Sequence, residues 1–210
     1  MSEVVDGSTL KYGGVEITYL KHAGFKIKGS VTIYIDPYEV PKGLEKADII
    51  LITHDHFDHK DIKSITNLAG DDTVVVYPKG CFVEGYKSCE LSVGETVELK
   101  GVKIETIPAY NIDKPYHKEG GVGYIVEIDG VRIYHAGDTD RIPEMKNVKV
   151  DVALLPIGGT YTMDVKEAVE AAKDIQAKYY VPMHYGAIPG TEADPREFKV
   201  EGAIILKPLL

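Results

Sequence analysis

Apolar and polar residues alternate along the first part of the chain with a period of two. This period is typical of half-buried antiparallel strands, and it recurs in three segments separated by glycines: residues 15–20, 25–28 and 31–35. Two later runs, 49–53 and 73–77, are apolar throughout, which suits strands covered on both faces. Apolar residues spaced along one helical face predict a helix over 60–68, ended by Gly70.

The second half of the chain repeats this succession of short strands. Six segments are predicted as strands: residues 102–107, 122–128, 131–134, 152–157, 179–183 and 203–206. Asp129 and Gly130 stand between two of them and are typical of a tight hairpin. Residues 165–178 carry an apolar stripe at helical spacing, and Asp164 with Glu167 resembles a capping box at the start of that helix.

Two strand-rich halves, each with helices of its own, predict two sheets packed face to face with helices outside. A last short helix is expected over 194–197, where Pro195 stands at the first helical position. No linker, low-complexity tract or repeat interrupts the sequence. Residues 1–210 are therefore predicted to form a single domain.

Composition narrows the class of protein. Of the 210 residues, 44% are hydrophobic and 27% are charged, which is ordinary for a globular protein with a substantial core. The net charge of -9 argues against nucleic acid as a partner, because phosphate binding needs a cationic face. The N-terminal residues resemble no signal peptide, and no apolar run approaches the roughly 18 residues of a membrane helix. We expect a cytoplasmic protein without a membrane partner.

The two cysteines add little chemistry. Cys81 and Cys89 are spaced like neither a zinc knuckle nor a CxxC redox motif. Free thiols in a reducing cytosol are expected, and a disulfide between the two is the alternative.

Four potential metal ligands follow the apolar run 49–53 within six residues: His54, His56, Asp58 and His59. Two histidines two residues apart on an extended segment point to the same side and can reach one metal. The last two ligands lie past the bend into the helix and can reach a second metal. Imidazole together with carboxylate favours zinc, iron or manganese over calcium or magnesium.

Other predicted strands also end in residues that can bind metals. Asp138 follows the strand 131–134 and is best placed to bridge two ions, and His184 follows 179–183 and would complete the shell of the second ion. Asp36 ends the strand 31–35. Because strand ends can converge in space, these residues are expected to join the motif.

In this arrangement the chain resembles the metallo-β-lactamase superfamily, whose HxHxDH motif matches residues 54–59. The resemblance continues in chain order through Ile-Asp-Pro at Asp36, His-Ala-Gly-Asp-Thr at Asp138 and Pro-Met-His-Tyr at His184, and so covers nearly the whole chain. It implies an α/β (α+β) fold, a four-layer αββα sandwich of two mixed β-sheets with the metals at one edge.

Two segments refine the resemblance. Residues 21–25 and 154–164 are similar to the branch that contains ascorbate-6-phosphate lactonase-like and N-acylphosphatidylethanolamine phospholipase D-like proteins.

One position departs from the family pattern. The third histidine for the first metal is expected just after the strand 102–107, where Asn111 stands, and asparagine is a poor zinc ligand. We predict that His117, six residues further on in a loop flanked by proline and glycines, replaces it. His22 as the ligand and an incomplete first site are the alternatives.

Further residues are expected around the metals rather than on them. Asp36 is expected to hydrogen-bond and orient a ligand histidine, with stabilisation of a turn as the alternative. His135 is expected to be structural or to support a ligand. His22 is expected to line the cleft or act on substrate, and Tyr161 and Tyr185 are candidates for substrate contact.

These residues together predict a metal-dependent hydrolase of a small molecule. Two divalent ions, Zn²⁺ first and Mn²⁺ or Fe²⁺ as alternatives, would share a water and lower its pKa from 15.7 to about 7, with Asp58 as the catalytic carboxylate. An ester, lactone or phosphodiester, possibly anionic, is the expected substrate. A true β-lactamase is disfavoured because no export signal is visible, and a flavodiiron oxidoreductase because no flavin domain follows. The alternative is a non-catalytic metal-binding sensor or scaffold protein of the same fold.

Overall fold

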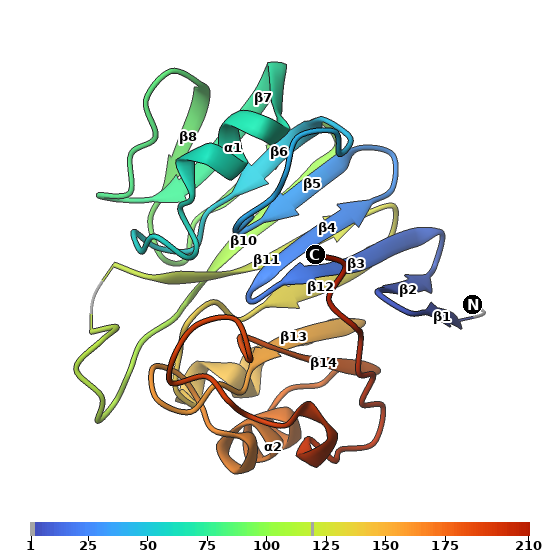
Figure 1. The fold of residues 1–210 in the computed structure, drawn as a ribbon, viewed down its shortest axis with the longest axis vertical. Coiled ribbons are helices and arrows are strands. Elements are labelled where there is room, and N and C mark those ends of the chain that lie inside the picture. Colours follow the sequence, from blue (N-terminus) through green and yellow to red (C-terminus); the bar gives the residue numbers. More distant parts are fainter. Residues whose placement is uncertain (1–2, 119) are drawn as a thin grey trace.

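Two β-sheets pack face to face and carry helices on their outer faces (Figure 1). The structure, a computed structural model, describes residues 3–118 and 120–210. Within these residues the first sheet has the order β1 (Glu3–Asp6), β2 (Thr9–Tyr12), β3 (Val15–Lys21), β4 (Gly24–Lys28), β5 (Thr32–Ile35), β6 (Ala47–Leu51), β7 (Ala69–Pro78), β8 (Lys87–Leu91). The second has the order β14 (Tyr179–Met183), β13 (Val152–Pro156), β12 (Val131–His135), β11 (Val122–Ile128), β10 (Val102–Pro108), β9 (Thr96–Leu99).

Each sheet mixes antiparallel and parallel pairs, as the family resemblance implies. In the first sheet, neighbours from β1 to β5 run antiparallel and those from β5 to β8 run parallel. In the second, β9 to β12 run antiparallel and β12 to β14 run parallel. In the first sheet, the ends of β5 and β6 therefore lie at the same edge as the turn between β3 and β4. In the second, the ends of β10, β12 and β14 share one edge in the same way.

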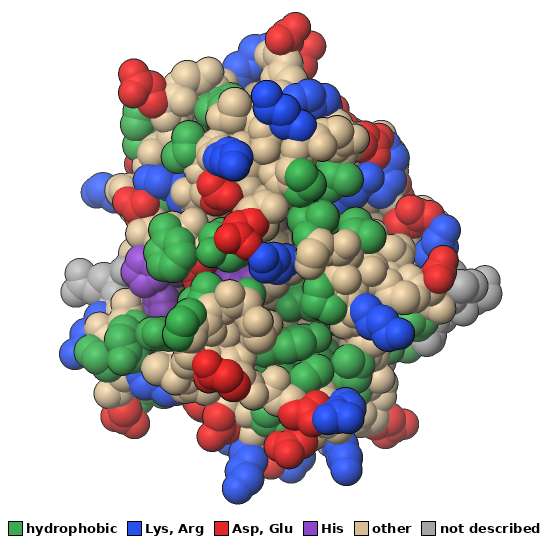
Figure 2. Space-filling view, viewed as in Figure 1, with side chains coloured by type: hydrophobic (Ala, Val, Ile, Leu, Met, Phe, Trp, Pro, Cys, Tyr) green, Lys and Arg blue, Asp and Glu red, His purple; other side chains and the backbone are tan. Residues whose placement is uncertain are grey.

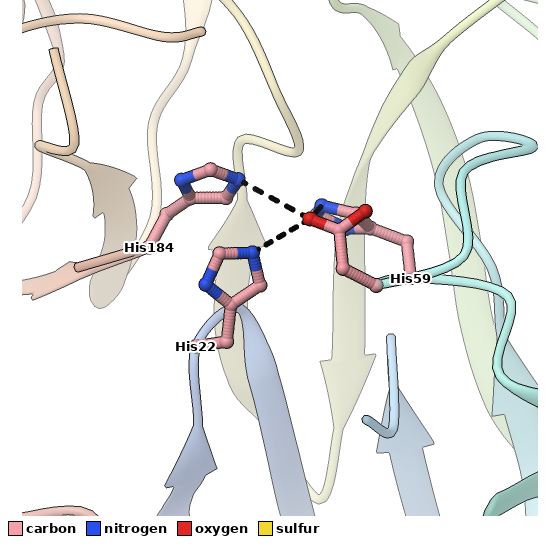
Figure 3. Close-up of side chains that lie close together, drawn as sticks. His22, His59 and His184 are labelled. Carbon is pink, nitrogen blue, oxygen red and sulfur yellow. Dashed lines mark hydrogen bonds and ion pairs between the residues drawn. The ribbon is translucent and has the colours of Figure 1, made fainter. Parts of the chain in front are cut away.

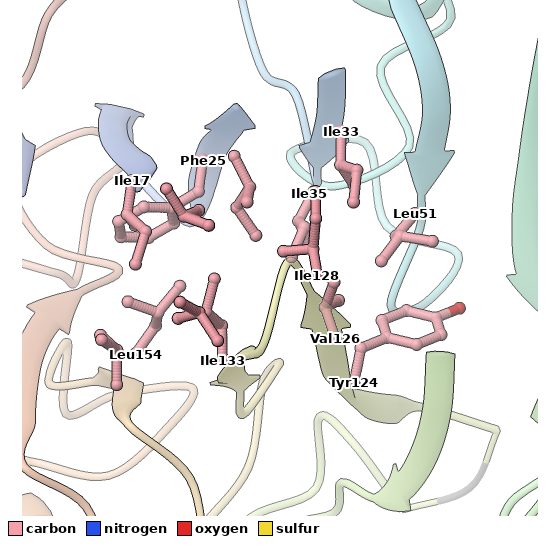
Figure 4. Packing of buried hydrophobic residues seen from close by; sticks show 14 of the residues in the cluster. Ile17, Phe25, Ile33, Ile35, Leu51, Tyr124, Val126, Ile128, Ile133 and Leu154 are labelled. Carbon is pink, nitrogen blue, oxygen red and sulfur yellow. The ribbon is translucent and has the colours of Figure 1, made fainter. Parts of the chain in front are cut away.

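Alternate residues of the central strands enter different cores. Ile49 and Leu51 of β6 pack between the two sheets, whereas Ile50 packs under α1 (Ile62–Leu68) beside Ile65. Figure 4 shows side chains of the two sheets facing one another across the central core. Burial of one such side chain stabilises the fold by about 1.5–3 kcal/mol. The prediction that 49–53 is covered on both faces is confirmed.

The second sheet is covered in the same manner by α2 (Val165–Asp174). Its buried alanines, Ala168 and Ala171, pack with Ala153 and Leu155 of β13. Small residues on this helix face let the helix lie close to the sheet, which completes the fourth layer.

The hairpin between β11 and β12 has the turn that its sequence predicts. Asp129 and Gly130 have φ angles of 50° and 78°, and Ile128 pairs with Val131 across the turn. Positive φ at both central residues defines the tight turn that matches the twist of the strands.

Both predicted α-helices are shorter than expected. The first begins at Ile62 because Asp61 caps it by accepting a hydrogen bond from the Lys63 N–H, and it ends at Leu68. The second ends at Asp174 instead of residue 178, because Ile175 is extended and buried and the chain turns there toward β14. The short helix expected near 194–197 is a 3₁₀ turn, η2 (Pro195–Glu197).

The strand predicted over 203–206 is wrong. Ala203 makes a single bridge to Tyr180, and the chain then crosses to the first sheet, where the Lys207 N–H donates to the Gly7 carbonyl at 3.0 Å. Ile204 and Leu206 are buried in the core between the sheets. Their apolar alternation therefore reflects packing rather than pairing.

Several elements are not foreseen by the apolar pattern: β1, β2, β8, β9 and the 3₁₀ helix η1 (Pro143–Asn147). Cys81 and Cys89 are free thiols, as expected. None of the described helices has the length and apolar character needed to cross a membrane.

Candidate metal centre

Histidine and aspartate side chains from both sheets meet at one edge of the sandwich. Each follows the end of a strand: His22 after β3, Asp36 after β5, His54 to His59 after β6, His117 after β10, Asp138 after β12 and His184 after β14. The topology brings these strand ends together although they are up to 162 residues apart in sequence (22 to 184). Two groups that share no residue could each hold a cation, and a third set, Asp36 with His54 and His59, takes one histidine from each of them.

The first group consists of His54, His56 and His117, whose ligand atoms lie within 4.8 Å of one another. His56 Nδ1 lies 3.1 Å from His54 Nε2 and 3.2 Å from His117 Nε2. His56 is exposed while the other two are buried, so this group stands at the mouth of the site. The structure thus brings His117 to the two motif histidines.

Asn111 explains how His117 is held in place. Its Oδ1 accepts hydrogen bonds from the His117 backbone N–H (2.9 Å) and from Nδ1–H (3.1 Å). Its Nδ2 donates to Asp140 Oδ1 and to the Tyr161 carbonyl, each at 3.0 Å. Because Nδ1 carries the proton, the lone pair of His117 Nε2 is free and points toward His56.

The second group consists of Asp58, His59, His184 and, unexpectedly, His22. His22 Nε2 lies 2.8 Å from Asp58 Oδ2, and His184 Nε2 lies 4.0 Å from the same oxygen (Figure 3). The rings of His22 and His184 are 3.9 Å apart between centroids. His22 is buried behind Asp58, so the prediction that it lines the cleft or touches substrate is wrong.

Asp138 lies at the centre of the cluster. Its Oδ2 is 3.0 Å from His184 Nε2, 3.2 Å from His117 Nε2, 3.3 Å from His59 Nε2 and 3.7 Å from His54 Nε2. One carboxylate oxygen therefore touches ring nitrogens of both groups, which is the position required of a bridging ligand.

Asp36 holds the motif from behind. It accepts hydrogen bonds from His59 Nδ1 (2.7 Å), the Thr53 N–H (2.8 Å) and Thr53 Oγ1 (2.6 Å). Thr53 Oγ1 in turn lies 2.9 Å from His54 Nδ1. With both Nδ1 atoms engaged, His54 and His59 turn Nε2 toward the centre, where these atoms can bind a metal.

Glycine permits the close approach of the loop after β13 to His184. A Cβ on Gly158 would lie 2.5 Å from the His184 carbonyl oxygen and 3.0 Å from His184 Nδ1. His22, Asp36 and His184 themselves have φ angles of 59°, 45° and 60°. Non-glycine residues in this region are uncommon and concentrate at functional sites.

His135 lies outside both groups. Its Nε2–H donates to the Ala23 carbonyl at 2.8 Å, and its Nδ1 accepts from the Gly137 N–H at 3.2 Å. Both ring nitrogens are used by the backbone, so His135 has no atom left for a metal.

Burial and mutual proximity determine the charge of the cluster. Burial and neighbouring histidines lower the pKa of His54 well below its usual value, which favours the neutral, ligating form. Burial opposes ionisation of Asp138, but His184 and His59 outweigh it and hold the pKa of Asp138 well below its usual range. Burial would likewise lower the pKa of His59, yet Asp138 and Asp36 raise it well above its usual value.

Several buried polar atoms in the cluster have no hydrogen-bond partner among the described residues: His59 Nε2, Asp138 Oδ1 and both ring nitrogens of His184. Leaving a buried polar group unpaired costs about 1–3 kcal/mol. Imidazole and carboxylate are ligands of zinc and related ions. The donor set and its unpaired atoms therefore fit divalent metal ions.

A cavity of about 350 Å³ opens in front of the cluster. Its floor contains His56, Asp58, His117, Asp138 and His184, and its walls are Phe57, Tyr116, Tyr161, Ile188 and Pro189. Figure 2 shows histidine side chains reaching the surface with hydrophobic side chains on two sides of them.

Tyr161 and Tyr185 lie in different places relative to the cavity. Tyr161 lines the cavity, whereas Tyr185, a candidate for substrate contact from its sequence position, does not belong to the lining and packs its ring near Tyr19. The sequence did not predict that the cavity is also lined by Phe57, Tyr116, Ile188 and Pro189. Only Phe57 carried a signal, since it is an apolar residue inside a loop of polar ligands.

Comparison with known proteins agrees with this geometry. A profile described as the beta-lactamase superfamily domain matches residues 16–184. A relative from Pyrococcus furiosus, named UPF0173 metal-dependent hydrolase, is 38% identical over 219 residues, covering 92% of this chain and 97% of its own length.

Solved structures are similar over nearly the whole chain. A crystal structure from Parabacteroides distasonis is 34% identical with a TM-score of 0.83, covering 98% of this chain and 100% of that one. A metallo hydrolase from the hyperthermophilic archaeon Ignicoccus hospitalis is 30% identical with a TM-score of 0.79, covering 92% of this chain and 95% of that one.

Proposed function

The chain belongs to the metallo-β-lactamase superfamily and to its UPF0173 family of metal-dependent hydrolases, and on this premise we propose that it hydrolyses a small molecule at a dinuclear zinc site. The observation that carries the proposal is the place of Asp138 Oδ2, within 3.7 Å of ring nitrogens from both histidine groups. A carboxylate so placed supports two ions rather than one.

The residues divide between the two ions. His54, His56 and His117 would hold the first, and Asp58, His59 and His184 the second, with Asp138 bridging them. His22 would orient Asp58 by donating a hydrogen bond to its Oδ2. The donor set favours Zn²⁺, and Mn²⁺ and Fe²⁺ are the ions against which zinc should be tested.

When bound, two such ions activate a water molecule and polarise the bond that it attacks. Asp58 faces the cavity and is the carboxylate that would receive the proton of that water. Burial disfavours its charged form, but the hydrogen bond from His22 and the proximity of the His59 ring outweigh burial and keep the pKa of Asp58 far below its usual range. Asp58 is thus ionised at neutral pH, the form in which a carboxylate binds a metal ion.

Esters, lactones and phosphodiesters are the proposed substrates, as in the lactonase-like and phospholipase D-like branch that segments 21–25 and 154–164 resemble. In ester hydrolysis, the oxygen of water bonds to the acyl carbon and the bond to the leaving oxygen breaks. One proton of the water passes to that leaving oxygen, so that ester and water give acid and alcohol.

Asn111 does not favour the alternative function, a metal-binding sensor without turnover. The absence of the expected histidine there was the reason to consider it, and in the structure Asn111 holds His117 against His54 and His56 instead. Hydrolysis is therefore the one function that we propose.

Metal analysis and a substrate screen test this function. Purified protein should contain about two metal ions per chain, and the zinc-loaded form should hydrolyse members of a panel of esters, lactones and phosphodiesters. His54→Ala and His117→Ala should each lose metal and more than about a hundredfold in kcat/KM, since even residues behind metal ligands are worth 10–100-fold.

His135→Gln is the matched control, because it alters a buried histidine that ligates nothing and should keep both ions. A protein that binds two ions but hydrolyses no compound above the His54→Ala background would refute the proposal. Unchanged metal content in His117→Ala would refute the assignment of that ligand.

A further inference from the structure

The cavity wall opposite the metal ligands is apolar and comes from four separate loops, with Tyr161 in the loop after β13. Phe57 lies within the ligand motif, Tyr116 lies in the loop before His117, and Ile188 and Pro189 follow His184. Residues from loops so far apart in sequence meet only at this cavity. A cavity of about 350 Å³ falls at the lower end of the range for small-molecule sites.

The wall is held in place by its own contacts. The rings of Tyr116 and Tyr161 meet edge to face with centroids 4.9 Å apart, and Tyr161 Oη donates to the Pro189 carbonyl at 3.3 Å. The Phe57 ring lies edge to face with Tyr38 at 6.1 Å. These contacts arrange the wall before a ligand arrives, which lowers the entropy cost of binding.

Folding does not explain why the aromatic rings of the wall are exposed. Phe57 is 69% and Tyr116 47% exposed, although each would stabilise the fold if it were buried. Exposed apolar side chains that gather around a cavity are typical of a binding site, whereas apolar side chains exposed singly are ordinary.

Cationic side chains are missing from the wall. Among the described residues that line the cavity there is no lysine or arginine. Three lysines of neighbouring loops are each paired with a carboxylate: Lys21 with Glu39, Lys60 with Asp55 and Lys114 with Asp140. An anionic group packed against this wall would lose its hydration without gaining a partner.

We propose that the substrate is uncharged apart from the reacting bond and carries an alkyl or aryl group that packs against Phe57 and Tyr161. Its ester or lactone carbonyl then faces the metal ligands on the floor of the cavity. This inference rests on the proposed hydrolase function and narrows its substrates. It replaces the expectation of an anionic substrate from the sequence.

Binding of hydroxamates tests the wall without relying on turnover. A hydroxamate group ligates metal ions, so a series from acetohydroxamate to hexanohydroxamate places alkyl tails of increasing length in the cavity of the zinc-loaded protein. Calorimetry should show affinity rising by about three- to fourfold per added methylene until the wall is filled, the fold-change that corresponds to about 0.8 kcal/mol. Succinic monohydroxamate, whose tail ends in a carboxylate, should bind at least about tenfold more weakly than the uncharged hydroxamate of equal length.

Variants of the wall locate the effect. Phe57→Ala and Tyr161→Ala should flatten the dependence of affinity on tail length. Phe82→Ala is the matched control, because Phe82 is 62% exposed but does not line this cavity, and it should keep the dependence. Metal content and circular dichroism of each variant establish that it is folded and loaded.

Two outcomes overturn the inference: affinity independent of tail length, or binding of the carboxylate tail as tight as that of the uncharged one. A slope retained in both wall variants, or lost equally in the control, also overturns it. Hydrolysis of para-nitrophenyl esters separates the two proposals. Tail-dependent hydroxamate binding without turnover of any ester, lactone or phosphodiester above His54→Ala would refute the hydrolase and leave the wall, and turnover without tail preference would do the reverse.

Discussion

The histidines of this site are defined by what their second ring nitrogen does. His54, His59 and His117 each engage Nδ1 with an oxygen atom, from Thr53, Asp36 and Asn111 respectively. Nδ1 is thereby occupied in each ring, and Nε2 is the atom that faces the centre. A histidine whose tautomer is already set binds a metal without first reorganising its hydrogen bonds.

Substitution of Asn111 tests most directly how a single residue positions a ligand histidine. Asn111→Ala removes the acceptor of the His117 backbone N–H and one of the two acceptors of Nδ1–H, the other being the Tyr161 carbonyl, so His117 should be held less firmly. We expect the affinity for the first ion to fall by roughly 10–100-fold, while the second ion stays bound. Titration of the metal-free variant with zinc, followed by calorimetry, measures the two affinities separately.

Asn111→Asp supplies the comparison, since a carboxylate keeps the acceptor. It should retain more of the first affinity than the alanine variant does. Equal first-ion affinities in Asn111→Ala and the unmodified protein would contradict the positioning role.

The sequence predicted the residues of the site better than their partners. His54 to His59, Asp138 and His184 stand directly after apolar strands, so their place at a sheet edge followed from the pattern. The contact of His22 with Asp58 did not, because it depends on how the turn after β3 lies against the motif loop. The wall depends in the same way on loops whose paths no periodicity encodes.

Among the secondary-structure elements, the candidate site depends on where the strands end more than on how long they are. The central strands were predicted within a few residues because they are apolar on both faces. The edge strands β1, β8 and β9 have exposed polar positions and weak alternation, and so they were missed. Residues 203–206 alternate like a strand, yet they pack across the sheets.

His135 links an element of each sheet. It ends β12, and its Nε2–H donates to Ala23 in the turn between β3 and β4, so that it joins the sheets beside the metal cluster. Burial lowers the pKa of His135 despite the hydrogen bond to Ala23. The neutral form is therefore the one that the folded protein stabilises.

A pH dependence of stability follows from this shift. Because the folded pKa is below the unfolded value of about 6.5, the contribution of His135 is fully present above pH 6.5. It is lost as the pH falls below that value, with a slope of at most about 1.4 kcal/mol per pH unit. His135→Gln should lower the free energy of unfolding by about 1–3 kcal/mol at pH 7.5, and the difference from the unmodified protein should shrink toward pH 5.5.

Denaturant unfolding of both proteins in the presence of a chelator checks this prediction, because pH-dependent metal binding then does not enter and the other histidines are the same in both proteins. A difference that is constant from pH 7.5 to 5.5 would contradict the neutral His135.

For the whole molecule, the proposed metal ligands form a link between the two sheets. The motif histidines and Asp58 belong to the first sheet, whereas His117, Asp138 and His184 belong to the second. Bound ions would therefore stabilise the packing of one sheet on the other, in addition to their chemistry.

Chelation should destabilise the protein as a whole. Each ion present at a thousandfold excess over its Kd contributes about 4 kcal/mol to the free energy of unfolding, and for a chain of this size each kcal/mol shifts the Tm by roughly 2–4 °C. The Tm should then fall by roughly 8–16 °C for each ion that is removed. Differential scanning calorimetry of zinc-loaded and chelated protein measures the shift.

His54→Ala, which lacks a first-group ligand, should show a smaller shift on chelation. A protein that releases its zinc without any change in Tm would show that the ions do not hold the sheets together.

The wall and the ligands are different sets of residues. Within the described residues, none of the five wall side chains belongs to a group that could hold a metal. Mutations that reshape the wall should therefore leave the chemistry intact, and those that alter the proposed ligands should abolish it whatever the shape of the wall. Relatives with the same metal centre can therefore differ in substrate while sharing a reaction. Directed evolution of this enzyme toward a new substrate can begin at the few positions of the wall.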